Sequence, residues 1–267
     1  MGNYNWSNDD IKRKIELIKS FEDKEKYRND IITLNGMLSK DIEERHITGE
    51  LQSELDCHQS LLRKWAEDFV HIVEENGNDI GVPSFGFLYL SDDELLSIVH
   101  DFYKTRIPQI YETFEKEFAK KDYNLRIKEA LFHSSAVTYH IKCLNQSYIN
   151  IEKSNSIFDA VNLAHEYGHA VGFHINNELA SNDNFIIIDD LDGEYFELEF
   201  INWLIANNIH TEEAVLAKMF VNHNMYCKAR YLQHLYNIQK SAYLNSYLTS
   251  IELSNADNKD ELFIRLI

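Results

Sequence analysis

The chain has 267 residues and a formal net charge of −18, which works against binding to nucleic acid or to an anionic membrane surface. Its 44% apolar residues are accompanied by only 2 prolines and 9 glycines, and this composition favours long helices over a β-rich fold. A chain of this length can bury a substantial core, either in one large domain or in two lobes.

The N-terminal residues are polar and include no apolar run long enough for a signal peptide or a membrane span. The three cysteines, Cys57, Cys143 and Cys227, are widely spaced and odd in number, so a disulfide framework is not expected. These features predict a cytoplasmic protein that does not bind a membrane. The sequence does not determine the oligomeric state.

The first half of the chain reads as a series of helices. Apolar residues recur at helical spacing among charged ones in four segments, Asp10–Phe21, Lys24–Glu44, Gly49–Glu75 and Ser91–Lys121. We therefore expect a helical lobe over residues 1–125, forming one wall of a cleft. The remainder, residues 126–267, is predicted to be a second lobe that carries the chemistry.

A short β-hairpin is predicted next. Val137, Tyr139 and Ile141 alternate with polar residues, and the segment Tyr148-Ile149-Asn150-Ile151 follows after a turn-like stretch. An edge strand at this place can pair with the backbone of an extended peptide. The alternative is a hairpin that only covers the core.

The stretch His165-Glu166-Tyr167-Gly168-His169 is the strongest chemical signal in the chain. Apolar residues at helical spacing predict a helix over 156–175, which Ser156 can cap. On that helix His165 and His169 lie on one face and can bind one zinc ion, while Glu166 stands beside them as a general base for an activated water. Gly168 weakens a helix interior, so we expect another backbone or a substrate to pass close to it.

Catalytic zinc needs a third protein ligand, and several acidic residues downstream are candidates. These are Glu178, Asp183, Asp189, Asp190, Asp192, Glu194, Glu197 and Glu199. After a short apolar segment at 185–188, the residues following Gly193 fit a second helix, on which Glu194 and Glu197 share a face and Glu199 points elsewhere. Glu194 is the predicted ligand. Glu197 is expected behind it or, like Asp189, as its substitute, and the remaining acids are expected on a solvated face.

Residues 156–170 resemble the active-site helix of the M3 metallopeptidases, the family of oligoendopeptidase F and thimet oligopeptidase. In that family a glutamate that opens a later helix completes the zinc site, and here Glu194 follows His169 by 25 residues. The resemblance implies a mainly α, zincin-like fold with a small β-hairpin or sheet beside the active-site helix. It assigns one zinc ion to His165, His169 and Glu194, with Glu166 as the base. The chain departs from the family pattern at Gly172 and Ile201, and it is much shorter than usual for the family.

The likeness extends from about residue 148 to residue 236 and includes a late helix, predicted here within 219–243. In the family such a helix binds the substrate and stabilises the tetrahedral intermediate, which places His223 and Tyr231 among the catalytic residues. Tyr226, His234 and Tyr148 are candidate substrate contacts, although tyrosines at helical spacing are more often part of a core. Ordinary surface or core positions are expected for the other histidines considered, His46, His58, His71, His100 and His210.

The sequence thus predicts a zinc metallopeptidase that hydrolyses oligopeptides or small unfolded segments, with a peptide as its partner. Two alternatives stay open. One is a zinc protease with a single protein target, and the other is an inactive relative that only binds peptides. The intact Glu166 disfavours the inactive form, because the base is central to the chemistry.

Overall fold

The computed structural model describes residues 13, 66–67, 70–71, 86–108, 110–112, 115, 124–130, 134–141, 146–175, 190–234, 247, 250–251 and 253–257. Its helices are α4 (Asp92–Arg106), α6 (Phe158–Ile175), α7 (Leu191–Ala206) and α8 (Thr211–His234). Its strands are β1 (Leu125–Glu129), β2 (Ser135–Ile141) and β3 (Gln146–Lys153). The described part is therefore mainly helical with a small three-stranded sheet, as the sequence predicted.

Helix α4 forms the start of the predicted helix 91–121. Ser91 caps it: the Ser91 hydroxyl accepts the Glu94 backbone N–H at 3.3 Å, and the Glu94 carboxylate accepts the Ser91 backbone N–H at 2.9 Å. This reciprocal pair satisfies two N–H groups that the first turn of a helix otherwise leaves open. The three earlier predicted helices lie outside the described residues, except for residue 13 and the helical positions 66–67 and 70–71.

The predicted hairpin is confirmed as β2 and β3, which pair antiparallel with Tyr139 opposite Tyr148. A strand that the sequence did not predict, β1, runs parallel to β3, so the sheet order is β1-β3-β2. Only five residues long, β1 is too short to give a clear alternation. Within the described residues, β2 is an edge strand next to α6.

Helix α6 carries the HExxH sequence and begins two residues later than predicted. Its start is organised by Asp159, whose carboxylate accepts the backbone N–H groups of Ser154, Asn155 and Ser156 at 2.8, 2.9 and 3.3 Å. The Ser156 hydroxyl instead contacts the Ser154 hydroxyl at 3.0 Å. The negative charge of Asp159 near the first turn also suits the helix dipole.

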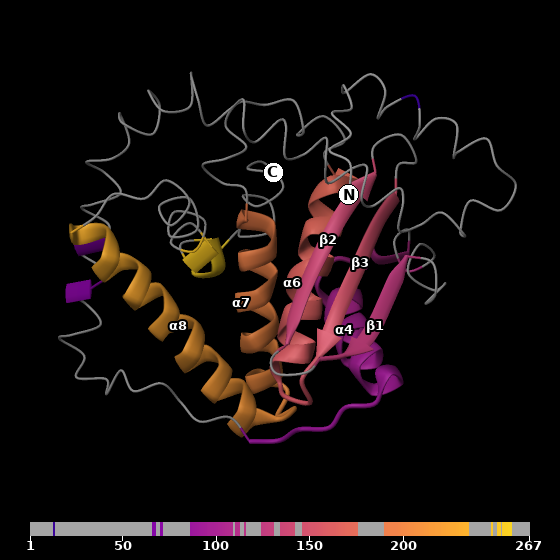
Figure 1. The fold of residues 1–267 in the computed structure, drawn as a ribbon, viewed down its shortest axis with the longest axis horizontal. Coiled ribbons are helices and arrows are strands. Elements are labelled where there is room, and N and C mark those ends of the chain that lie inside the picture. The colour runs from indigo at the N-terminus through magenta and orange to yellow at the C-terminus, as the bar shows by residue number, and fades with distance from the viewer. Residues whose placement is uncertain are drawn as a thin grey trace, which may run out of the picture.

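Helix α6 lies between the sheet and α7, with α4 beside it (Figure 1). Its buried side chains join those of α4, β3 and α7 in one core. The large aromatic side chains of this core are Phe102, Tyr103, Tyr167, Tyr195, Phe196 and Phe200. Burying each large apolar side chain contributes roughly 1.5–3 kcal/mol, so this core dominates the stability of the region. The buried Tyr103 hydroxyl donates to the Ala164 carbonyl at 2.6 Å, which fixes α4 against α6 just before the first histidine.

Helices α6 and α7 approach closely because glycines face the contact. A Cβ on Gly168 would lie 2.6 Å from the backbone oxygen of Asp192 and 3.1 Å from the Cα of Gly193. A Cβ on Gly193 would lie 2.5 Å from Nε2 of His165. A backbone or a substrate was expected beside Gly168, and the structure shows a backbone there, the first turn of α7.

Helix α7 begins before Gly193, and α8 runs from Thr211, earlier than its predicted start. An ion pair between Arg106 and Glu199 at 2.9 Å ties α7 to the last turn of α4. Glu199 is buried in this ion pair, so the expectation that it lies on a solvated face is wrong. Among the helices of the described region, none combines the length and apolar character that crossing a membrane requires.

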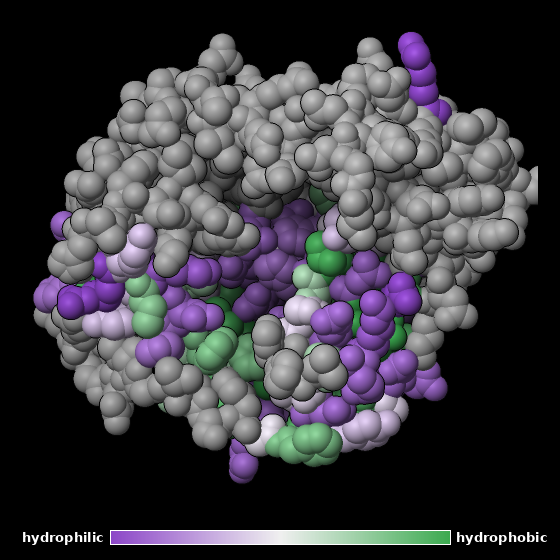
Figure 2. All heavy atoms as spheres, viewed as in Figure 1, coloured by the Kyte–Doolittle hydropathy of each residue, from purple (hydrophilic) through white to green (hydrophobic). Residues whose placement is uncertain are grey.

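Figure 2 shows hydrophilic residues gathered in a hollow in the middle of the molecule. In the same view, Figure 1 places the C-terminal half of α6 and the N-terminal end of α7 there. His169 lies in this half of α6, with His165 one turn before it, and the acidic residues Asp192 and Glu194 lie in the first turn of α7.

Candidate metal centre

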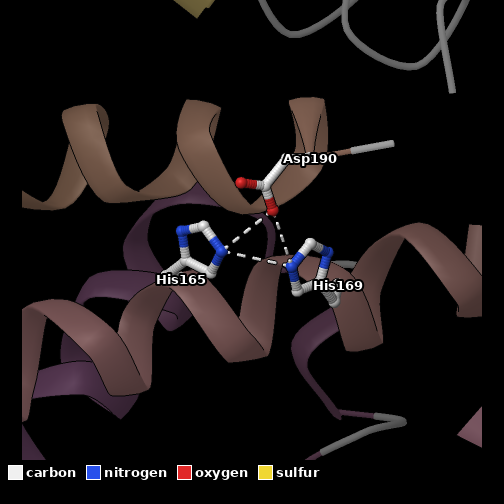
Figure 3. Close-up of side chains that lie close together, drawn as sticks. All are labelled: His165, His169 and Asp190. Carbon is white, nitrogen blue, oxygen red and sulfur yellow. Dashed lines mark hydrogen bonds and ion pairs between the residues drawn. The ribbon is translucent and has the colours of Figure 1, made fainter. Parts of the chain in front are cut away.

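Three ligand atoms converge where α6 meets the start of α7 (Figure 3). The Nε2 atoms of His165 and His169 are 3.1 Å apart, as the four-residue spacing on one helix face predicts. Asp190 Oδ1 lies 3.2 Å from each of these two nitrogens. The three atoms form a nearly equilateral triangle.

The size of this triangle fits a small divalent cation. A tetrahedral zinc ion with bonds of about 2.0–2.1 Å to its ligands separates them by about 3.3–3.4 Å. The distances of 3.1, 3.2 and 3.2 Å differ from that spacing by a few tenths of an ångström. Two imidazoles and a carboxylate are also a donor set that zinc accepts.

The Nδ1 atom of each histidine contacts a carboxylate of α7. His165 Nδ1 lies 2.9 Å from Glu197 Oε2, and His169 Nδ1 lies 2.7 Å from Asp192 Oδ1. In a neutral imidazole, a proton on Nδ1 leaves a lone pair on Nε2. Both carboxylates therefore favour the tautomer that turns an Nε2 lone pair toward the common point, as partners of metal-binding histidines do.

The surrounding charges favour a cation at this point. Burial alone would lower the pKa of His165, but the carboxylates of Asp190 and Glu197 outweigh burial and hold it well above its usual range. The pKa of His169 is likewise raised, because Asp192 and Asp190 outweigh its burial. Burial would raise the pKa of Asp190, yet the two histidines lower it strongly. A metal ion that binds here must displace protons from the histidines.

Glu166, the predicted base, is buried and stands next to His165 on α6. Its backbone carbonyl accepts the Thr138 hydroxyl at 3.0 Å, so β2 runs directly beside this residue. Burial raises the pKa of the Tyr103 hydroxyl well above its usual range, and the nearby Asp192, Tyr167 and Glu166 raise it further.

Glu194, the predicted third ligand, lies in the first turn of α7 with 5% of its surface exposed. Its Oε2 is buried and has no hydrogen-bond partner among the described residues. Burial raises the pKa of Glu194 well above its usual range, and the nearby Glu197 and Asp190 raise it further. An unpartnered buried carboxylate is costly, and a neighbouring cation would offset that cost.

Among the residues that the structure describes, the carboxylate that lies next to both Nε2 atoms belongs to Asp190, which was expected on a solvated face. Glu197 lies behind His165, as predicted for an outer position. Asp192, also expected on a solvated face, holds His169 instead. The substitute ligand Asp189 lies outside the described residues, as do Glu178, Asp183 and the apolar segment 185–188.

The described cluster of ligand atoms does not include the predicted catalytic residues of α8. His223 is partly buried, with an Nδ1 that has no partner within the described region and an Nε2 3.5 Å from Cys227 Sγ. Tyr231 is partly buried on the same helix. Their catalytic roles stay predictions.

The candidate substrate contacts have varied settings. Tyr226 packs against a small cluster of Ala66, Val70 and Ala229, and Tyr148 is fully buried in β3. His234 ends α8, but its side chain lies outside the described part.

Three of the five histidines expected at surface or core positions belong to the described residues. His100 is partly buried and shares a hydrogen bond of 2.8 Å with the Tyr167 hydroxyl, which confirms it as a satisfied core position. His71 is exposed, and His210 is partly buried in the turn before α8. His46 and His58 lie outside the described residues.

Comparisons of the chain with protein-family models, with curated proteins and with solved structures gave no match. The case for a function therefore rests on the geometry of this site.

Proposed function

We propose that the chain is a zinc-dependent metallopeptidase with a zincin-like active site. The observation that carries this proposal is the triangle of His165 Nε2, His169 Nε2 and a carboxylate oxygen, with edges of 3.1–3.2 Å and a second carboxylate behind each imidazole. Both histidines come from an HExxH helix whose Glu166 is intact. One zinc ion is the expected cofactor, and a peptide is the expected substrate.

His165 and His169 would hold the ion together with a carboxylate from the first turn of α7. Asp190 fits because its Oδ1 lies 3.2 Å from both Nε2 atoms. Glu194 fits because its buried Oε2 has no hydrogen-bond partner among the described residues, a cost that a cation would offset. A bound zinc supplies a Lewis acid that polarises a carbonyl and lowers the pKa of a water ligand toward about 7.

The proposed role of Glu166 is proton transfer. It takes a proton from the attacking water and returns it to the nitrogen of the leaving amine. The edge strand β2, which contacts the Glu166 backbone through Thr138, is suited to pair with the backbone of an extended peptide. His223 and Tyr231 are proposed to donate hydrogen bonds to the carbonyl oxygen as its charge develops.

The test is digestion of a random peptide mixture by the zinc-loaded protein, with products identified by mass spectrometry. We expect cleavage that a chelator abolishes. Glu166→Gln should keep its zinc and its melting temperature but lose activity by about 10²–10⁴-fold, because general acid–base catalysis contributes on that order.

Glu212→Gln is a matched control, since Glu212 is an exposed glutamate in the first turn of α8. It should cleave like the wild type. Full activity in Glu166→Gln would refute the proposed mechanism, and a zinc-loaded protein that cleaves no peptide would refute the peptidase activity itself.

One observation favours a second candidate, a metal-holding protein without catalysis. Asp190 and Glu194 both belong to the start of α7, and if both bound the ion together with the two histidines, no position would stay open for water. Structural zinc sites are closed in this way. Cobalt substitution distinguishes the two, because an open site changes its visible spectrum when a small anion such as cyanide binds, whereas a closed site does not.

A further inference from the structure

Asp192 sits in a space that two glycines create between α6 and α7. Its Oδ1 accepts the Gly193 backbone N–H at 2.9 Å and lies 2.7 Å from His169 Nδ1. Its Oδ2 lies against Gly172, where an added Cβ would come within 2.1 Å of that oxygen. One carboxylate oxygen thus contacts His169, and the other occupies the space that Gly172 leaves open.

Gly172 leaves open the space that the Asp192 carboxylate occupies. It is buried on α6 three residues after His169, so it lies on the neighbouring turn of the same face. Any side chain there would overlap the present position of Asp192 Oδ2. Glycine costs about 1 kcal/mol in a helix interior, and at this position the cost is explained by the room that Asp192 needs.

The contact favours one tautomer and one orientation of the His169 ring. A carboxylate at Nδ1 favours the proton on that nitrogen and leaves the Nε2 lone pair facing His165 Nε2 and Asp190 Oδ1. It also increases the basicity of the imidazole as a ligand. Glu197 holds His165 in the same way, so the two imidazoles have separate supports on one helix.

We propose that Asp192 is the positioning residue of His169 and that Gly172 is the residue that makes its position possible. This inference rests on the proposed zinc site. It concerns the affinity of the site for the metal, not the cleavage reaction.

Two substitutions test the proposal from opposite sides of the contact. Asp192→Asn removes the charge but keeps the shape, and Gly172→Ala keeps the charge but displaces it. Both should weaken zinc binding by about 10–100-fold, the usual cost of losing an outer carboxylate partner. Affinity is measured by competition with a chromophoric chelator, and Asp101→Asn, an exposed aspartate of α4, is the control that should bind like the wild type.

The tautomer gives a readout that a purely structural role would not move. In the zinc-loaded wild type, two-dimensional ¹H–¹⁵N spectra of the histidine rings should show His169 protonated at Nδ1 and bound through Nε2. In Asp192→Asn the Nδ1 proton should exchange faster with water. Gly172→Ala provides the same test if Asp192→Asn fails to fold.

The outcomes separate this inference from the proposed function. Unchanged zinc affinity and an unchanged His169 ring signal in both variants would overturn the role of Asp192 and leave the zinc site standing. A wild-type protein that binds no zinc would overturn the site itself and this inference with it. Weaker binding with no peptide cleavage by the wild type would support the role of Asp192 and refute the peptidase.

Discussion

Asp190 occupies the N-cap position of α7, where an aspartate usually accepts a backbone N–H from the first turn. Its side chain makes no such hydrogen bond and lies instead between the two histidine nitrogens. Loss of a side-chain cap costs about 1 kcal/mol, so interactions with the histidines or with a cation must compensate for it. In the sequence, Asp190 and Asp192 are only acidic residues near the start of a helix. They could therefore not be distinguished from surface residues.

The orphaned oxygen of Glu194 leads to a prediction about the third ligand. Asp190 already has two partners, whereas Glu194 Oε2 is buried with none described, so a cation relieves a larger cost at Glu194. We expect Glu194→Gln to lower zinc affinity more than Asp190→Asn does. Both affinities are measured by chelator competition, with thermal unfolding of the metal-free proteins as a check on folding. A larger loss in Asp190→Asn would instead make Asp190 the ligand.

The contact between α6 and α7 assembles the site, because the described carboxylates that contact the two histidines are Asp190, Asp192 and Glu197, at the N-cap and in the first two turns of α7. That contact depends on Gly168, which lies against the backbone of Asp192 and Gly193, and on Gly193, which leaves room for the His165 ring. The presence of a close neighbour at Gly168 could be predicted, since a glycine in a helix interior needs a reason. Its identity could not be predicted, because helical spacing does not tell which element crosses which.

Gly168→Ala tests how tightly this contact is built. Alanine favours a helix by about 1 kcal/mol over glycine, but its Cβ would lie 2.6 Å from the Asp192 carbonyl oxygen. We expect a net destabilisation of about 1–3 kcal/mol, the usual range for overpacking, measured by urea unfolding. Gly86→Ala is the control, since its Cβ would meet no atom within 4 Å and should change stability little. An equally stable or more stable Gly168→Ala protein would show that the helices can move apart freely.

For the molecule as a whole, the sequence predicted the elements better than their assembly. The hairpin, the HExxH helix and the acidic helix after it are confirmed within the described residues, because each has a strong local period. The β1 strand and the packing of α4 into the same core depend on long-range contacts that no local pattern encodes. The division at residue 125 and the cleft wall stay predictions, since most of the first lobe lies outside the described part.

The central claim is that the imidazoles of α6 bind one zinc ion. X-ray absorption at the zinc edge on the zinc-loaded protein tests it most directly, because it counts the ligands and identifies imidazole. We predict one zinc per chain, held by two imidazoles and oxygen ligands at about 2.0–2.2 Å, and loss of this signal in the double variant His165→Ala, His169→Ala. A protein without zinc, or a double variant that retains the same zinc spectrum, would contradict it.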